Sequence, residues 1–154
     1  MSADEHLNDI DHIRKRPSMY VGSTGFFGTI HYLVDATNLI LQHSPSCIEI
    51  SSYGAEFGIS SDIALPVHDN ENGERFPFEC FRRDGNAAIS HGPVLTALSE
   101  SLSYSERSDS GTIQYAYRSG LRTAPSTIDY PPEFRSHLRF TPDSTIFGDC
   151  VVSN

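Results

Sequence analysis

Positive charge is scarce in this sequence. Eleven lysine and arginine residues face twenty aspartate and glutamate residues, which leaves a formal net charge of −9. A nucleic-acid surface needs a basic field to bind phosphates, so direct binding to DNA is not expected. The one basic run is Arg14-Lys15-Arg16, and Lys15 is the sole lysine of the chain. A mechanism that needs a second lysine would have to take it from another chain.

Cysteines and long apolar runs are also few. The three cysteines, Cys47, Cys80 and Cys150, lie far apart without CxxC spacing. We therefore expect reduced thiols and a cytoplasmic protein, not a disulfide framework. No apolar run approaches the ~20 residues of a membrane span, and the acidic start MSADEHLNDI is unlike a signal peptide. The seven histidines show no metal-ligand spacing, so no metal site is expected.

Two helices are predicted near the start of the chain. A capping box at Ser2 and Glu5 begins the first, and Pro17 ends it. The glycines of MYVGSTGFFG predict a loop. Apolar residues at helical spacing then predict the buried face of a second helix: Phe27, Ile30, Leu33, Val34, Thr37 and Leu41. The other side of this helix carries the polar residues His31, Asp35, Asn38 and Gln42.

The rest of the chain is predicted to be mostly strands. CIEISS and EFGIS are joined around Tyr53-Gly54, ALPV opens a third strand, and the alternation in RFPFECFR indicates a half-buried one. PVLTALSESL is predicted as a short helix, and DSG at 109–111 as the turn between LSYSER and TIQYAYR. SHLRFT is the last predicted strand. This order of elements predicts an α+β fold in one domain.

The segment RKRPSMYVG, residues 14–22, resembles RKRPGMYIG at the start of the N-terminal ATPase domain of the DNA gyrase B subunit family, a group of GHKL ATPases. TALSESLSYSERSDSGTIQYAYRSG resembles the family's later helix and hairpin, and HLRF resembles its MVRF strand. The similarity covers most of residues 8–145. It implies a Bergerat-type two-layer sandwich, with helices packed on a mixed, mostly antiparallel sheet. It also implies that residues 1–154 are one such domain, lacking the transducer domain that follows in the family.

The resemblance places the family's catalytic glutamate, which activates the attacking water, at Asp35. Aspartate keeps the carboxylate but is shorter by about 1.5 Å, and a misplacement of ~1 Å can cost on the order of 100-fold in rate. The family's Mg²⁺-binding asparagine falls four residues later, on Leu39, which offers no oxygen ligand. Asn38 is adjacent, but it points about 100° away around the helix.

The remaining family motifs are altered as well. The aspartate that binds the adenine amino group falls on Ser61 in SSDIALPV, and the motif's glycines are replaced by Ile63 and Leu65 or their neighbours. RDGNAAISHGP stands where the family has a glycine-rich lid around the phosphates. The late-strand threonine corresponds to Ser136, which keeps a hydroxyl. Asn38, Ser61 and Ser136 are thus the candidate nucleotide-binding residues.

We therefore expect a degenerate gyrase-B-like domain that has lost ATP hydrolysis and acts by binding another protein or by self-association. The family's N-terminal arm reaches across a dimer, and the apolar Met19, Tyr20, Phe26 and Phe27 could serve that way. No cofactor is expected, and ATP and Mg²⁺ are implied by the resemblance alone. The alternatives are a weak ATP-binding or ATP-hydrolysing protein that uses Asp35, Asn38 and Ser136, and a DNA-topology factor that acts through a true gyrase.

Overall fold

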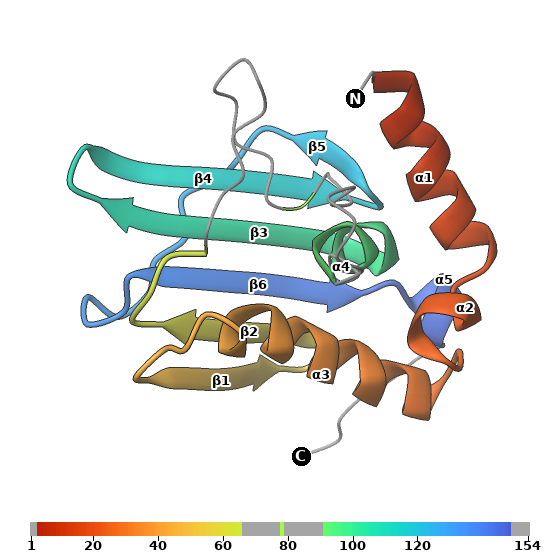
Figure 1. Ribbon diagram of the computed structural model, residues 1–154, viewed down its shortest axis with the longest axis horizontal. Coiled ribbons are helices and arrows are strands. Elements are labelled where there is room, and N and C mark those ends of the chain that lie inside the picture. Colours follow the sequence, from red (N-terminus) through yellow and green to blue (C-terminus); the bar gives the residue numbers. More distant parts are fainter. Residues whose placement is uncertain (1–2, 66–77, 79–90, 149–154) are drawn as a thin grey trace.

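A layer of helices covers one face of a six-stranded sheet (Figure 1). The computed structural model describes residues 3–65, 78 and 91–148. Its helices are α1 (Ala3–Lys15), α2 (Ser18–Val21), α3 (Phe26–Leu41), α4 (His91–Leu98) and α5 (Ser144–Phe147). Its strands are β1 (Ile48–Tyr53), β2 (Glu56–Ser61), β3 (Ser99–Ser108), β4 (Gly111–Arg118), β5 (Leu121–Thr123) and β6 (Ser136–Pro142). The α+β two-layer sandwich predicted from the sequence is confirmed.

The strand order across the sheet is β1-β2-β6-β3-β4-β5, and each of these neighbouring pairs is antiparallel. The late strand β6 is inserted between the two hairpins, where Leu138 is paired with both Ile59 and Tyr104. Side chains alternate across a sheet, so these three residues share the face beneath the helices. Both hairpins predicted from the sequence are confirmed, as is SHLRFT as a strand.

The main core lies between the two layers. The sheet contributes aromatic side chains that are almost completely buried, including Tyr104, Tyr117 and Phe140. The helices pack against them with the buried side chains of Ile13, Tyr32, Ala36, Leu95 and Leu98. The Tyr32 hydroxyl donates to the Leu95 carbonyl at 2.9 Å and bonds the Ser99 hydroxyl, which ties α3 to α4. Hydrogen bonds depend on geometry more strictly than apolar packing does. This buried polar contact therefore helps to fix the position of α3 relative to α4.

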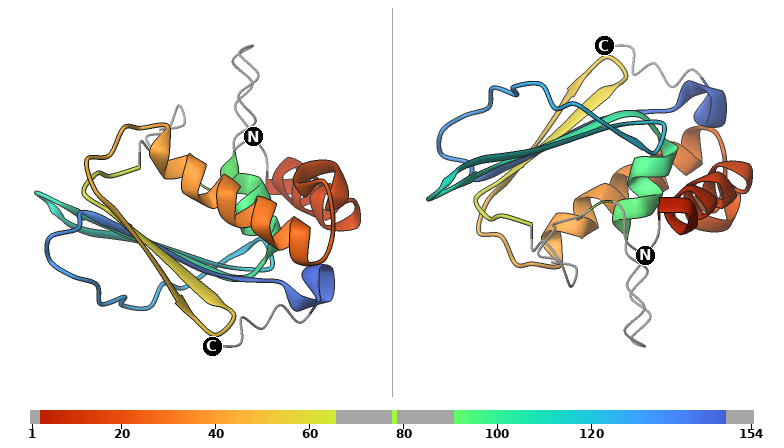
Figure 2. Two further views of the ribbon diagram at one scale, coloured as in Figure 1. Left: turned by 90° about the horizontal axis from the view of Figure 1, so that it is seen from below. Right: turned by 90° about the horizontal axis from the view of Figure 1, so that it is seen from above.

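A second, smaller cluster lies on the opposite face of the sheet. There the segment 124–135 crosses the strands, as the two views of Figure 2 show, and buries Ile128, Tyr130 and Phe134. The Arg107 guanidinium lies 4.0 Å from the centre of the Tyr130 ring and donates to the carbonyls of residues 130, 131 and 134. This side chain helps to hold a segment without regular structure against the sheet, together with backbone hydrogen bonds from the Arg107 amide to the Arg135 carbonyl and from the Arg135 amide to the Ser61 carbonyl.

The predicted loop MYVGSTGFFG is partly helical. Pro17 ends α1 as expected, but its αR backbone also begins a further turn, α2, which stops at Gly22 (φ 75°). Gly25 (φ 123°) then precedes α3. Gly28, inside α3, lies so close to the Ser23 carbonyl that an added Cβ would come within 1.9 Å of the oxygen. The glycine spacing therefore serves a tight helix-turn-helix connection.

The predicted buried face of α3 was largely wrong, although Leu33 is partly buried against the core. Phe27 is 71% exposed, Val34 49% and Leu41 45%, whereas the residues packed against the core are Gly28, Thr29, Tyr32, Ala36, Leu39 and Ile40. The helix is apolar on two sides, so hydrophobic periodicity alone could not decide which side is buried. One apolar face of α3 is consequently left in solvent.

Other predictions were correct only in part. The helix predicted over PVLTALSESL ends at Leu98, because the chain from Ser99 onward pairs with β6. Ala64 and Leu65 of the predicted strand ALPV have no regular structure, and RFPFECFR lies outside the described residues apart from Phe78, which is fully buried. The capping box at Ser2 also lies outside them. The short elements α5 and β5 had no clear pattern in the sequence.

Candidate functional site

The structure brings together two of the four candidate nucleotide-site residues. Ser61 on β2 and Ser136 on β6 are direct cross-strand partners, and both side chains are buried. The Ser61 hydroxyl accepts a hydrogen bond from the Ile63 amide at 3.2 Å, and the Ser136 hydroxyl donates to the Ile63 carbonyl at 2.6 Å. Both hydroxyls thus form hydrogen bonds with the backbone of Ile63, just after the end of β2.

The groups around this serine pair also bond to one another. The Tyr104 hydroxyl donates to the Glu106 carboxylate at 2.9 Å and accepts from the Leu65 amide at 2.9 Å. Burial raises the pKa of Tyr104 far above its ordinary value, and the charge of Glu106 raises it further. The hydroxyl therefore stays protonated and donates to the carboxylate. These polar groups therefore bond to one another within the protein and are not left free to bind a ligand.

The other two candidates, Asp35 and Asn38, lie on α3. Asp35 is half-buried and makes interactions within the chain. Asn38 is exposed and lines an apolar groove whose lining includes neither Ser61 nor Ser136. Leu39, at the position where the resemblance puts a Mg²⁺ ligand, is only 8% exposed and belongs to the main apolar core. Asn38 and Leu39 therefore lie in different surroundings, one in the groove and the other in the core.

The basic run at the end of α1 has a structural role that spacing alone did not reveal. Arg14 donates to the Ala97 carbonyl in the last turn of α4 and to the Asp143 carboxylate, both at 2.6 Å. Asp143 in turn caps α5 by accepting from the amide and hydroxyl of Thr145. Lys15 forms an exposed ion pair with Asp11 one turn earlier. Arg14 therefore joins three helices instead of reaching toward a ligand.

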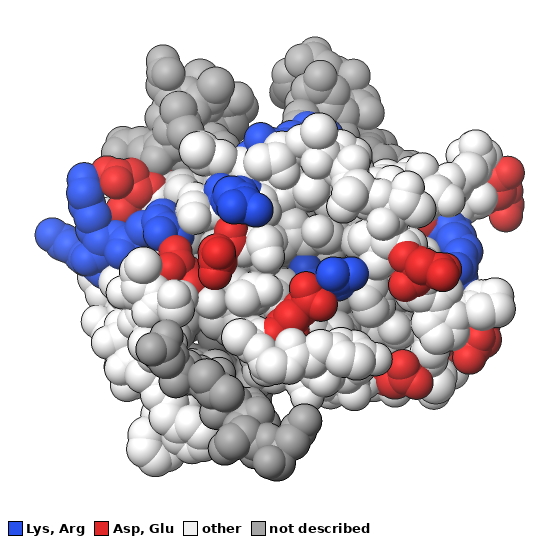
Figure 3. All heavy atoms as spheres, turned by 180° about the vertical axis from the view of Figure 1, so that it is seen from behind, with Lys and Arg blue, Asp and Glu red and all other residues white. Residues whose placement is uncertain are grey.

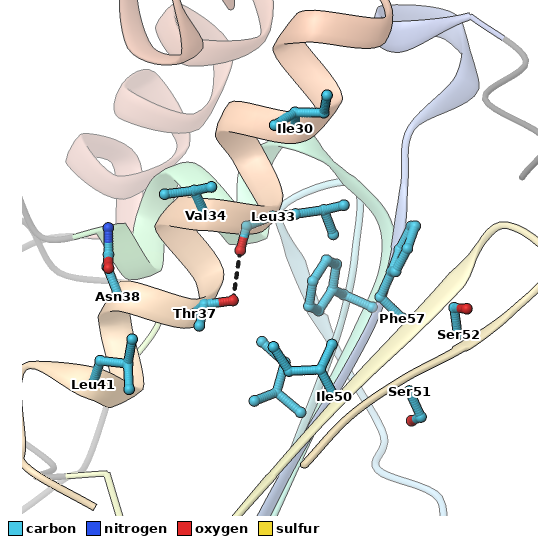
Figure 4. A pocket seen from close by; sticks show the side chains of 12 residues that line it. Ile30, Leu33, Val34, Thr37, Asn38, Leu41, Ile50, Ser51, Ser52 and Phe57 are labelled. Carbon is cyan, nitrogen blue, oxygen red and sulfur yellow. Dashed lines mark hydrogen bonds between the residues drawn. The ribbon is translucent and has the colours of Figure 1, made fainter. Parts of the chain in front are cut away.

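An apolar groove of about 480 Å³ lies between α3 and the strands β1 and β2 (Figure 4). In Figure 4, Leu33 and Thr37 point from α3 toward the strands, and Val34, Asn38 and Leu41 line the groove from the same helix. None of the lining residues is charged: Ile30, Leu33, Val34, Thr37, Asn38, Leu41, Ile50, Ser51, Ser52, Phe57, Ile59 and Phe140. Ligand pockets are commonly of this size and largely apolar. The second apolar stripe of α3 was the sequence signal for this groove.

A smaller polar cavity, about 190 Å³, lies on the opposite face of the sheet, between the strands and segment 124–135. It contains a serine–histidine contact that the sequence did not suggest: Ser60 Oγ lies 2.9 Å from His137 Nδ1. Burial lowers the pKa of His137, with the nearby Arg139 acting in the same direction. Ser60 lies within the ladder between β1 and β6, so its own amide is not placed to stabilise an oxyanion. The contact serves packing, since His137 also stacks on Tyr130.

The face opposite the helices carries basic and acidic side chains together (Figure 3). One ion pair on it joins Arg139 and Glu56 at 2.8 Å. Within residues 3–65, 78 and 91–148, no group of three or more His, Cys, Asp and Glu side chains is placed to hold a metal ion. No helix in the same ranges is long and apolar enough to cross a membrane.

No protein-family model and no curated protein sequence matches this chain. Among solved structures, it is similar to the 43K ATPase domain of Thermus thermophilus gyrase B in complex with an aminocoumarin, with a TM-score of 0.75 and 22% sequence identity. The match covers 99% of this chain but 44% of the gyrase chain, so it spans less than half of that protein's length. At this identity the likeness shows the fold: the chain has the α+β arrangement of a GHKL, or Bergerat, domain.

Proposed function

We propose that this protein is a degenerate Bergerat-fold domain that no longer hydrolyses ATP and acts by binding another protein. The exposed apolar side of α3 carries the proposal. Nine large hydrophobic side chains are exposed in the described ranges, and five of them belong to this one helix. Such a concentration marks an interaction surface, whereas single exposed apolar residues are ordinary.

The nucleotide-site positions support the loss of catalysis. Mg²⁺ requires hard oxygen ligands, and the corresponding residue, Leu39, is packed into the core. The hydroxyls of Ser61 and Ser136 are engaged by the Ile63 backbone, so adenine would have to displace a peptide to reach them. The residues present therefore do not fit ATP with Mg²⁺, and no catalytic step is assigned to Asp35.

Calorimetric titration with a non-hydrolysable ATP analogue and Mg²⁺ tests this part of the proposal. We expect no saturable heat at high micromolar protein and no phosphate release in a hydrolysis assay. The alternative, a weak ATPase, is favoured only by the carboxylate of Asp35 and the surviving hydroxyl of Ser136. It predicts a higher melting temperature with nucleotide, since a ligand at 100 times its Kd stabilises the folded state by about 2.7 kcal/mol. Saturable binding that is lost in Ser136→Ala would overturn the proposal.

Protein binding is tested by retention of partners on the immobilised chain. A variant with a charge on the α3 face, Val34→Asp, is compared with Leu121→Asp, which places the same charge on an equally exposed apolar residue of β5. We expect partner retention to be lost in the first variant and kept in the second. The net charge of −9 also predicts no gel shift with duplex DNA at physiological salt. Equal retention by the two variants would remove α3 as the binding surface.

A further inference from the structure

We infer that the partner seated on α3 is a second copy of this chain, with the two α3 helices antiparallel across a two-fold axis beside Val34. This inference rests on the proposed function and names the partner for the same surface. The surface consists of the α3 stripe (Phe26, Phe27, Ile30, Val34 and Leu41) together with Ile50 of β1.

The stripe combines a projection and a hollow. At its start, Phe26 and Phe27 form an edge-to-face pair with ring centres 5.7 Å apart, and both rings are about 70% exposed. Toward its end, Val34 and Leu41 line the groove together with Ile50. A projection and a hollow on the same helix make a self-complementary surface, which is what a two-fold interface requires.

The spacing along α3 fixes the position of the axis. Val34 lies seven residues after Phe27 and seven before Leu41. At 1.5 Å rise per residue, each interval is about 10 Å. A two-fold axis beside Val34 therefore brings the Phe27 of each copy to the partner's Leu41, at the mouth of the groove. The antiparallel arrangement also opposes the two helix dipoles, which is favourable.

The exposed apolar side chains supply roughly three quarters of the area that a stable dimer buries on each partner. With about 200 Å² for a complete aromatic side chain and somewhat less for aliphatic ones, the six exposed side chains present roughly 600 Å². The groove walls add to this, and a stable interface buries about 800 Å² on each partner. A flexible peptide would cover the groove but leave the phenylalanine pair exposed, whereas a second copy covers both.

The charge pattern favours contact at this surface over other sites. Each copy carries −9, so two copies repel at most orientations. The groove has no charged residue, and the charged or titratable groups of α3, His31 and Asp35, lie outside the stripe. Approach through the stripe brings the least like charge together.

Sedimentation velocity of the full chain over a range of concentrations tests the inference. We expect a monomer–dimer equilibrium in the wild type. Val34→Asp should weaken dimerisation at least about 100-fold, because the two-fold axis places the new carboxylates against each other in an apolar interface. Leu121→Asp is the matched control and should dimerise like the wild type. Circular dichroism confirms that each variant is folded.

A charge-pair experiment tests the two-fold geometry itself. Val34→Lys should also be monomeric, and an equimolar mixture of Val34→Lys with Val34→Asp should recover a mixed dimer. A dimer that persists in both single variants, or a mixture that stays monomeric, would overturn the antiparallel arrangement. A wild-type monomer at every concentration would overturn the second copy as partner. If that monomer still retains another protein in a Val34-dependent way, the proposed function stands, whereas saturable ATP binding is the result that removes it.

Discussion

Replacing Asp143 should separate two roles that its carboxylate combines. One oxygen accepts from the Thr145 amide and so caps α5, and the other accepts from Arg14, which also holds the end of α4. Asp143→Ala removes both roles. Asp143→Asn keeps a side chain that caps helices equally well but removes the charge. The Lys15–Asp11 pair supplies an exposed control in Asp11→Asn.

The expected losses follow from these contacts. A lost N-cap costs about 1 kcal/mol. A charge-assisted hydrogen bond is worth about 1.5–3 kcal/mol when buried, but the Arg14 side chain is 27% exposed, so about 1 kcal/mol is the better figure here. We expect unfolding free energy to fall by about 2 kcal/mol in Asp143→Ala, about 1 in Asp143→Asn and under about 0.5 in Asp11→Asn. Urea unfolding followed by circular dichroism measures all three.

The pH dependence supplies an independent check. Burial raises the pKa of the Asp143 carboxyl, but the hydrogen bonds from Thr145 and Arg14 outweigh it, so the net pKa lies below its ordinary 3.8. A carboxyl with a lowered pKa stabilises the folded state above the unfolded pKa and loses that effect as pH falls through the folded one. The stability gap between wild type and Asp143→Asn should be constant above about pH 5 and shrink below 3.8. Equal losses in Asp143→Asn and Asp143→Ala, or a gap independent of pH, would refute this reasoning.

Three further measurements address the core and the α3 connection. Spectrophotometric titration of the folded protein should leave at least Tyr32 and Tyr104 un-ionised at pH 11, because burial raises the pKa of both well above the ordinary value; ionisation of all seven tyrosines before unfolding would contradict this. Tyr32→Phe should lower unfolding free energy by about 1–2 kcal/mol through the lost hydroxyl bonds to α4 and the start of β3, with no change expected in the exposed control Tyr53→Phe. Gly28→Ala should destabilise by more than Gly54→Ala, since its Cβ would collide with the backbone carbonyl of Ser23, whereas an alanine at 54 meets open space and carries only the strain of a left-handed backbone (φ 64°); thermal melts showing the reverse order would mean that the close approach of Gly28 to Ser23 matters little for stability.

The fold was predictable from the sequence because its elements have strong local patterns. The two hairpins carry glycine turns between alternating strands, and RKRPSMYVG matched a family whose fold the structure shares. The α3 helix itself was predictable, but its orientation was not. Tyr32, Ala36, Leu39 and Ile40 have the same helical spacing as the exposed residues, and only the shape of the rest of the core determines which set is buried.

The candidate site was less predictable, because hydrogen bonds over long sequence separations decide it. The resemblance named Ser61 and Ser136 separately, and only the structure shows that they are partners on adjacent strands. Nothing in the sequence showed that both hydroxyls would be used by the backbone of Ile63. The role of Arg14 depends likewise on a contact with Asp143, 129 positions away. Such contacts have no local pattern and become visible only in three dimensions.

The ion pair at the end of α1 has a practical consequence for conjugation chemistry. Lys15 is the sole lysine, and its side chain is 71% exposed. Apart from the N-terminal amine, acylation or attachment through a lysine has a single target, so every conjugated copy carries its adduct at one position. Lys15→Arg keeps the positive charge beside Asp11 and removes that target. A protein with one attachment point gives a uniform labelled population, and a single conservative substitution abolishes every lysine-linked adduct.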